Sequence, residues 1–189
     1  MTQEQTGRHR GPRPAGQKAA IPLLAVLVGL LAVVLVVWLL NDDDDSSPEP
    51  VAAEVVSAAG LSDFSSPDDV PVYWAGAQDG ATLELSTTDT GTFVRYLTDG
   101  AKAGDPRADF LTVGTYEFAN PVGAIEKLAK QPNAVLRNLP GGGIAYWNKE
   151  SPTNIYVAPP GEEVQVEVFA PDPKQGREIV TSGQIVPVN

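Results

Sequence analysis

The sequence predicts an α+β protein: one N-terminal transmembrane helix, then a small, mainly antiparallel strand-rich domain with two short helices. Three observations lead to this fold class. A long uncharged run lies near the N-terminus, several later segments alternate apolar and polar side chains, and one segment opens with a capping residue followed by proline.

The uncharged run covers residues 21–40, of which fifteen are Leu, Ile or Val. A helix of this length spans about 30 Å, the thickness of the hydrocarbon core of a bilayer. The run is longer than the apolar region of a cleaved signal peptide, and no Ala-X-Ala pattern follows it. We therefore expect an uncleaved, single-pass signal-anchor.

The flanking charges predict the orientation of this helix. Four basic residues precede it within residues 8–18, and four aspartates follow it at 42–45. Positive residues favour the cytoplasmic side of a membrane. Residues 1–20 are thus expected to form a basic, disordered cytoplasmic tail, and the C-terminal domain is expected outside the cytoplasm at the plasma membrane.

Residues 41–69 read as an acidic, Pro- and Ser-containing linker, with a short helix predicted over 50–59. Carboxylates are calcium ligands, but a bare aspartate run lacks the spacing and the turning glycine of a calcium loop. The run is expected to be a solvated spacer, and no metal site is predicted. The extracytoplasmic domain is expected to occupy residues 70–189.

Alternation of apolar and polar residues predicts the strands of this domain. Residues 82–86 and 92–97 flank the turn 89–91 and are expected to form a hairpin. Further strands are predicted at 72–74, 110–118, 144–147, 155–158, 164–169 and 184–188.

Two helices are predicted, packed on one face of the sheet. Asn120 and Pro121 provide a cap and a first helical residue for a helix that ends before Pro132, and a second helix is expected over 173–180.

The two halves of the domain share several features. Tyr73-Trp74 and Tyr146-Trp147 each stand in the first strand of a half, and each half places Phe-Ala and a proline where a strand leads into a helix. An internal duplication is one interpretation, and chance similarity is the other.

Three short segments resemble a group of bacterial proteins. They are Pro71-Val72-Tyr73-Trp74-Ala75-Gly76, Val94-Arg95-Tyr96-Leu97 and Val113-Gly114-Thr115-Tyr116. In them the chain is similar to uncharacterised membrane-anchored or secreted proteins of high-GC Gram-positive (actinobacterial) bacteria. The resemblance covers about residues 70–188. It implies an exported location and transfers no functional residue.

Composition excludes several classes of function. The chain has no cysteine, and its single histidine, His9, lies in the basic tail. Disulfides, thiolate metal sites and histidine-based catalysis are therefore absent from the domain, and no cofactor is expected. The net charge is -11 overall. An acidic domain argues against a nucleic-acid partner, whose phosphates need a basic surface.

Carboxylates remain as candidate catalytic groups. Glu84, Glu117 and Glu167 all fall in predicted strands, and a glycosidase needs only two carboxyl groups. By alternation, Glu84 and Glu167 point away from the faces lined by their apolar neighbours, so both are expected on solvated strand faces. The glycines at 141–143 are expected to form a turn, because a strand rather than a helix follows them.

Aromatic residues are the strongest candidates for binding. The candidate ligand or partner contacts are Tyr73, Trp74, Arg95, Tyr96, Tyr146 and Trp147. The competing interpretation makes them core and rim of the sheet, and we expect both tryptophans to be buried. The expected function is that of a membrane-anchored, non-enzymatic binding or accessory domain at the cell envelope, with a protein or glycan partner. The alternative is a small envelope hydrolase that uses carboxylates.

Overall fold

The computed structural model describes residues 53–64 and 70–188. The expected cytoplasmic tail, the expected transmembrane helix at 21–40 and the aspartate run lie outside these residues. Within the described ranges, no helix has the length and apolar character needed to cross a bilayer.

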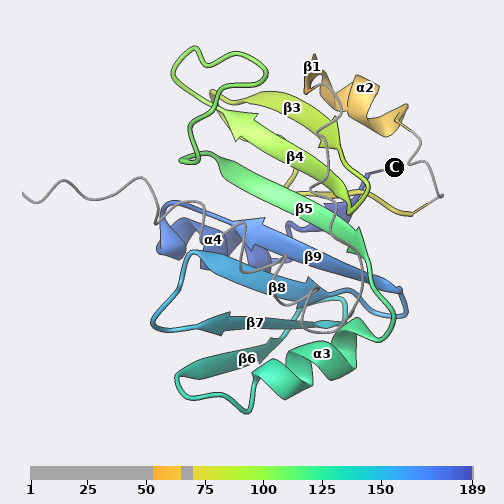
Figure 1. Ribbon diagram of the computed structural model, residues 1–189, viewed down its shortest axis with the longest axis vertical. Coiled ribbons are helices and arrows are strands. Elements are labelled where there is room, and N and C mark those ends of the chain that lie inside the picture. Colours follow the sequence, from red (N-terminus) through yellow and green to blue (C-terminus); the bar gives the residue numbers. More distant parts are fainter. Residues whose placement is uncertain (1–52, 65–69, 189) are drawn as a thin grey trace, which may run out of the picture. The chain divides into compact units, whose positions relative to one another are not determined.

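The domain is a strand-rich antiparallel sheet structure with few helices (Figure 1). Eight strands form one sheet in the order β1-β3-β4-β5-β9-β8-β7-β6. Their bounds are β1 Glu54–Val56, β3 Thr82–Thr87, β4 Thr92–Leu97, β5 Leu111–Glu117, β6 Ala134–Asn138, β7 Ile144–Asn148, β8 Asn154–Ala158 and β9 Val164–Phe169. A second sheet pairs β2 (Tyr73–Trp74) with β10 (Val186–Pro187).

The predicted hairpin is confirmed, with Leu85 opposite Val94 across β3 and β4. Alternation along each strand separates two faces of the large sheet. One face, here called the core face, carries the apolar cluster. Its members include Leu83, Leu85, Val94, Val113, Ile155, Val157, Val166 and Val168, and the small β2–β10 sheet packs on it through Tyr73.

Both predicted helices form, and the first begins at its predicted cap, Asn120. The Asn120 side chain accepts a hydrogen bond from the Gly123 amide at the start of α3 (Pro121–Leu128). The Asp172 side chain likewise accepts from the Lys174 amide at the start of α4 (Pro173–Thr181). These side chains satisfy backbone donors that a helix N-terminus leaves free.

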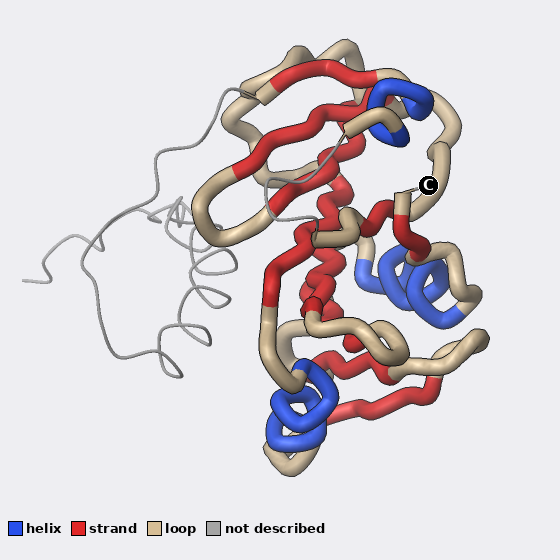
Figure 2. Tube along the Cα trace, turned by 90° about the vertical axis from the view of Figure 1, so that its right-hand side faces the viewer, coloured by secondary structure: helices blue, strands red, loops and turns tan. Residues whose placement is uncertain are grey.

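The helices lie on opposite faces of the sheet, which corrects the expectation that they share one. Ile179 and Val180 of α4 belong to the core-face cluster, whereas the fully buried Ile125 of α3 does not. Figure 2 shows the two helices on different sides of the strands. Helix α3 contacts β7 and β8, and α4 contacts β8 and β9, so helices cover both sides of the sheet at β8.

The helix placement also bears on the internal duplication. Strands β5 and β9 lie side by side and antiparallel, and each leads into a helix. A two-fold axis that relates neighbouring antiparallel strands is perpendicular to the sheet and maps each face of the sheet onto itself. If the symmetry were complete, α3 and α4 would therefore lie on the same face. In addition, Tyr73-Trp74 lies in the small sheet and Tyr146-Trp147 in the large one, so these pairs do not occupy equivalent strands.

Two elements differ from the sequence prediction. The expected helix over 50–59 is replaced by β1, followed by α2 (Ala58–Ser62), which Ser57 caps. Strand β6 was not predicted, because it is a half-exposed edge strand and its segment Ala-Val-Leu-Arg-Asn shows no alternation.

The folded unit begins before the expected boundary at residue 70. Strand β1 pairs with β3, and Leu61 of α2 is fully buried in the core. A fragment of residues 70–189 should be less stable than one of residues 53–189, since burying one leucine contributes about 1.5–3 kcal/mol. Urea denaturation of both fragments measures the difference. Equal midpoints and equal m-values would show that β1 and α2 add nothing to the domain.

Candidate functional site

The aromatic residues predicted as contacts are mostly buried. Tyr73, Tyr96, Tyr146 and Trp147 have exposed fractions of 7% or less, and Trp74 is half-buried against the core cluster. The Tyr96 hydroxyl accepts a hydrogen bond of 2.7 Å from the Ala75 amide, which joins the small sheet to the large one. Burial raises the pKa of Tyr96 to about 12. Tyr73 and Tyr96 therefore join the two sheets, and Trp147 belongs to the core cluster. Tyr146 is buried outside that cluster against Tyr156, so these residues do not form an exposed aromatic patch.

Arg95 anchors a long surface loop. Its guanidinium pairs with Glu84 Oε1 at 2.6 Å and donates to the backbone oxygens of Asp105 and Arg107. Glu84 Oε2 also accepts from the Gly104 amide at 2.6 Å. The expectation that Glu84 is solvated was wrong: it is 1% exposed, because its carboxylate is contacted by Arg95 and by Gly104 of the loop between β4 and β5. Arg95 is thus committed to the fold and is not a free cation for an anionic ligand.

Glu167 was also expected on a solvated face and is instead buried, with 7% exposed. Its carboxyl accepts hydrogen bonds from Asn154 at 2.6 Å and from the Tyr116 hydroxyl at 3.2 Å. Among the described residues, no Lys or Arg pairs with it. Desolvation raises the pKa of Glu167 to about 7, against the opposing effect of these two hydrogen bonds.

Burial also raises the pKa values of the tyrosines near Glu167. Desolvation, followed by the nearby Glu167 charge, raises the pKa of Tyr116 and of Tyr156 well above the usual value. Tyr156 stacks on Tyr146 with ring centroids 6.2 Å apart. Two residues before Glu167 on β9, the side-chain oxygen of Gln165 is buried without a hydrogen-bond partner among the described residues.

The two buried carboxylates do not form a catalytic pair. Glu84 is on β3 and Glu167 is on β9, which are separated by β4 and β5. Three strand spacings amount to about 14 Å. Glycosidase carboxyl groups lie about 5–9.5 Å apart, so this arrangement does not suit that chemistry.

A row of threonines crosses the core face where its apolar side chains end. Thr87 lies opposite Thr92, and Thr92 lies opposite Thr115. Such cross-strand threonine pairs suit neighbouring strands. Glu117 follows two residues after Thr115 on the same face, and the β3–β4 turn lies beside it. On each of these strands, the next position on the same face toward the middle of the sheet carries an apolar residue. The core face therefore changes at this row from apolar side chains to hydroxyls and a carboxylate.

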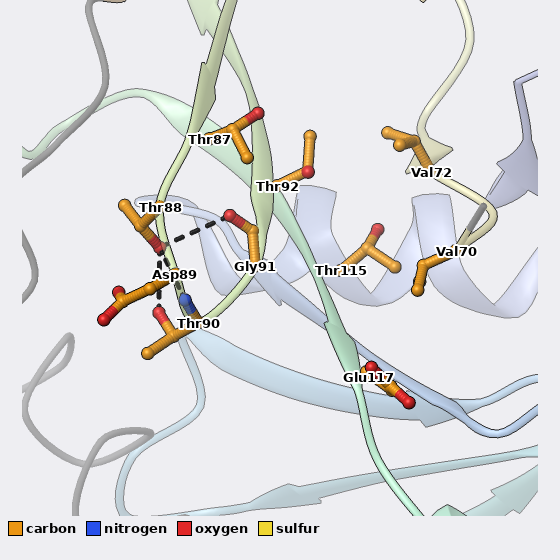
Figure 3. A pocket seen from close by; sticks show the side chains of 10 residues that line it. All are labelled: Val70, Val72, Thr87, Thr88, Asp89, Thr90, Gly91, Thr92, Thr115 and Glu117. Atoms are coloured by element: carbon orange, nitrogen blue, oxygen red, sulfur yellow. Dashed lines mark hydrogen bonds between the residues drawn. The ribbon is translucent and has the colours of Figure 1, made fainter. Parts of the chain in front are cut away.

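These residues line a pocket with a volume of about 80 Å³, here called the threonine pocket (Figure 3). Its lining comprises Val70, Val72, Thr87, Thr88, Asp89, Thr90, Gly91, Thr92, Thr115 and Glu117. The segment that precedes β2 supplies the valines. Ligand pockets for whole metabolites usually measure about 300–1,000 Å³, so this one suits a single chemical group.

Local contacts fix the walls of the threonine pocket. The Thr88 hydroxyl bonds to Thr90 and to the Gly91 oxygen, which closes the turn. A side chain at Gly91 would collide with the backbone oxygen of Thr115, so glycine allows the turn to approach β5. The Thr115 hydroxyl accepts from the Tyr73 amide at 3.0 Å, which ties the small sheet to the floor of the pocket.

One pocket hydroxyl remains available. The Thr92 side chain is 5% exposed and makes no hydrogen bond to the other residues drawn in Figure 3, but its hydroxyl is not among the fully buried atoms without a partner, so it opens into the pocket. Sequence reasoning missed this site. The sequence does show a threonine in each of three strands. Only the fold shows that these threonines lie opposite one another and that residues 70–72 cover them.

Within the described residues, no group of three or more metal-ligating side chains is brought together. The chain matches no protein-family model, no curated protein and no solved structure.

Proposed function

We propose that the chain is a single-pass, membrane-anchored binding or accessory protein whose extracytoplasmic sheet domain recognises a partner at the cell envelope. The observation that carries the proposal is the threonine pocket. It places a row of three threonines, Thr87, Thr92 and Thr115, on neighbouring strands, with carboxylates at its edge. Hydroxyl groups both donate and accept hydrogen bonds, so a polar group of a ligand can bind in this pocket.

The anchor supports the same proposal from the sequence. The uncharged run at 21–40 is long enough to span a bilayer, and the basic residues before it favour a cytoplasmic N-terminus. The domain would then lie outside the cytoplasm, where its pocket is accessible to proteins or glycans of the envelope.

The hydrolase alternative finds less support. The carboxylates that are buried are engaged in structural contacts, on strands too far apart to act as a pair. A binding role needs no such pair.

We expect the mature protein to keep its N-terminus. Sequencing of the membrane-extracted protein should find residues that precede the run at 21–40, since that run lacks a small-residue cleavage site. External protease applied to intact cells should remove the domain and leave a tag at the N-terminus protected. A main species that starts after Leu40 and is released into the medium would contradict the anchor.

The binding role is tested by crosslinking in intact cells, followed by identification of the proteins and glycans recovered. The matched variants are Thr92→Val, which removes the free hydroxyl while preserving size, and Glu126→Gln on the exposed surface of α3. A partner recovered with the native protein and with Glu126→Gln, but not with Thr92→Val, supports the pocket as the binding site. A partner retained by Thr92→Val places binding elsewhere.

A further inference from the structure

We propose that the open edge of the large sheet at β6 binds an extended, acidic segment of a partner protein, which adds to the sheet as a further strand. The inference goes beyond the proposed function, because it assigns a second surface that does not involve the threonine pocket. The pocket lies on β3, β4 and β5, and three strands separate β5 from β6 at the end of the sheet (Figure 1).

Hydrogen bonds at both ends of β6 show which of its backbone groups face β7. The Lys149 amide donates to the Asn133 oxygen at 3.0 Å, and the Leu139 amide donates to the Gly143 oxygen at 3.2 Å. In an antiparallel pair, residues bonded in this way alternate with residues whose N–H and C=O groups point away from the partner strand. The odd-numbered residues of 133–139 therefore bond to β7.

The even-numbered residues of β6 direct their backbone groups out from the sheet. The Ala134 amide donates to the Gln131 oxygen, and the turn before β6 thus satisfies it. The Leu136 oxygen accepts from the Arg137 side chain at 3.0 Å. The Leu136 N–H and both backbone groups of Asn138 form no hydrogen bond to another described residue. Such unpaired groups can bond to the backbone of an added strand.

The charges around β6 favour an acidic partner. Lys127 and Lys130 lie on α3, which leads into β6, whereas Arg137 is in β6 and Lys149 bonds to the residue before it. All four are exposed, and none forms an ion pair with a described carboxylate. Residues 121–150 contain these four basic residues and two acidic ones, whereas the rest of the chain beyond residue 40 has five basic and twenty-one acidic residues. This edge is therefore a positive region on an acidic domain, and it attracts acidic segments.

The side chains of β6 define the sequence that an added strand needs. Leu136 is 39% exposed and lies opposite Tyr146 on the same face as α3, so an apolar residue of the added strand can pack on it. The neighbouring residues of that strand lie on the other face, beside Arg137, where a carboxylate is favoured. A second copy of β6 would instead place arginine and lysine against like charges, which disfavours pairing of two copies through this edge.

The test titrates the full-length chain in detergent micelles with acetyl-Glu-Val-Glu-Val-Glu-amide, followed by amide NMR and hydrogen exchange. Saturable shifts in β6 are expected. Exchange should slow at Leu136 and Asn138, whose amides gain a partner, and change little at Val135 and Arg137, whose amides already bond to β7. Equal slowing at all four amides, or shifts spread over the whole domain, would overturn the proposal.

Two control peptides separate backbone pairing from charge. N-methylation of both valines keeps the charge but removes the peptide donors that face β6, and it should abolish binding. Replacing each glutamate with lysine keeps the donors and reverses the charge, and it should also abolish binding. Equal binding of the N-methylated peptide would show a purely electrostatic contact, and equal binding of the lysine peptide would refute the preference for acids.

Leu136→Pro removes an outward N–H that has no described partner. Proline is tolerated on an edge strand at such a position, so the amide spectrum outside β6 should remain native while peptide binding is lost. Retained binding would place the peptide elsewhere. Thr92→Val should bind the peptide as the native chain does, because the threonine pocket is separate. A loss of binding in Thr92→Val would show that β6 is not an independent surface.

Charge variants test the positive region directly. Combining Arg137→Gln with Lys149→Gln should weaken peptide binding about tenfold, as expected for the loss of two exposed charge pairs. Lys174→Gln, an exposed lysine on α4, is the matched control and should leave binding unchanged. Equal weakening by Lys174→Gln would indicate non-specific attraction between opposite charges and would refute a defined site.

Sedimentation velocity without peptide tests a second copy as the occupant. The native chain and Leu136→Pro should show the same association state. An association of the native chain that Leu136→Pro abolishes would show that β6 pairs with another copy, and it would overturn the assignment of a partner protein.

Discussion

Replacing Arg95 with alanine should destabilise the domain by about 3–5 kcal/mol, the cost of leaving one member of a buried ion pair without its partner. Glu84 is 1% exposed, and without Arg95 its charge would keep only the Gly104 amide as a donor. Urea denaturation of residues 53–189 measures the change in the free energy of unfolding.

Arg107→Ala is the matched control. Arg107 also lies over the Phe110 ring, at 4.7 Å against 5.1 Å for Arg95, but its ion pair with Asp105 is at the surface. Solvent screens exposed ion pairs, which contribute little to stability, so this change should cost little. If the two arginine variants were equally stable, Glu84 would not depend on Arg95.

The double variant Glu84→Gln with Arg95→Met tests the mechanism further. Removing both charges together should recover much of the stability that Arg95→Ala loses, because no unpaired buried charge remains. The loop between β4 and β5 should still exchange its amide hydrogens faster in the double variant, since Arg95 also holds the Asp105 and Arg107 carbonyls. Unchanged exchange in this loop would show that Arg95 does not anchor it.

The alternation of side chains predicted most strands, because each strand presents one apolar side to the core. Thr92–Leu97 and Val164–Phe169 form at the predicted positions for this reason. Alternation also correctly assigned Glu84 and Glu167 to the face opposite the apolar cluster. It could not show that a loop covers Glu84 or that tyrosines surround Glu167, since these contacts join residues far apart in the sequence.

Local signals were weakest at the edges of the sheet. β1 has only three residues and β6 is half-exposed, so neither shows a periodic pattern long enough to be recognised. The threonine pocket was missed for a related reason. Threonines at alternate strand positions are visible in the sequence, but only the register between strands makes them a continuous row.

The stability of the domain should fall as pH rises from about 5 to about 8, and Glu167 should be the cause. Its pKa in the folded state is raised from 4.5 to about 7, chiefly because burial disfavours the charged carboxylate. A raised pKa means that the folded state binds the proton more tightly than the unfolded state. The stabilising contribution is therefore complete below about pH 4.5 and is lost as pH rises through about 7.

A pKa change of this size corresponds to about 3 kcal/mol, at about 1.4 kcal/mol for each pKa unit. Few other groups interfere in this pH range, because the chain's single histidine is His9, which a fragment of residues 53–189 lacks. The groups that face Glu167 are Tyr116, Tyr156 and Asn154. The two tyrosines have their pKa raised, so neither loses its proton in this interval.

Glu167→Gln should remove the pH dependence and leave the domain more stable than the native fragment at pH 8. A glutamine can still accept the Asn154 hydrogen bond and carries no charge to desolvate. Glu117→Gln, an exposed glutamate on β5, is the matched control and should keep the native pH profile. Denaturant titrations at several pH values between 5 and 8 measure both effects. A native fragment whose free energy of unfolding does not change over this interval, or a Glu167→Gln variant that retains the native slope, would show that Glu167 keeps an ordinary pKa in the folded domain.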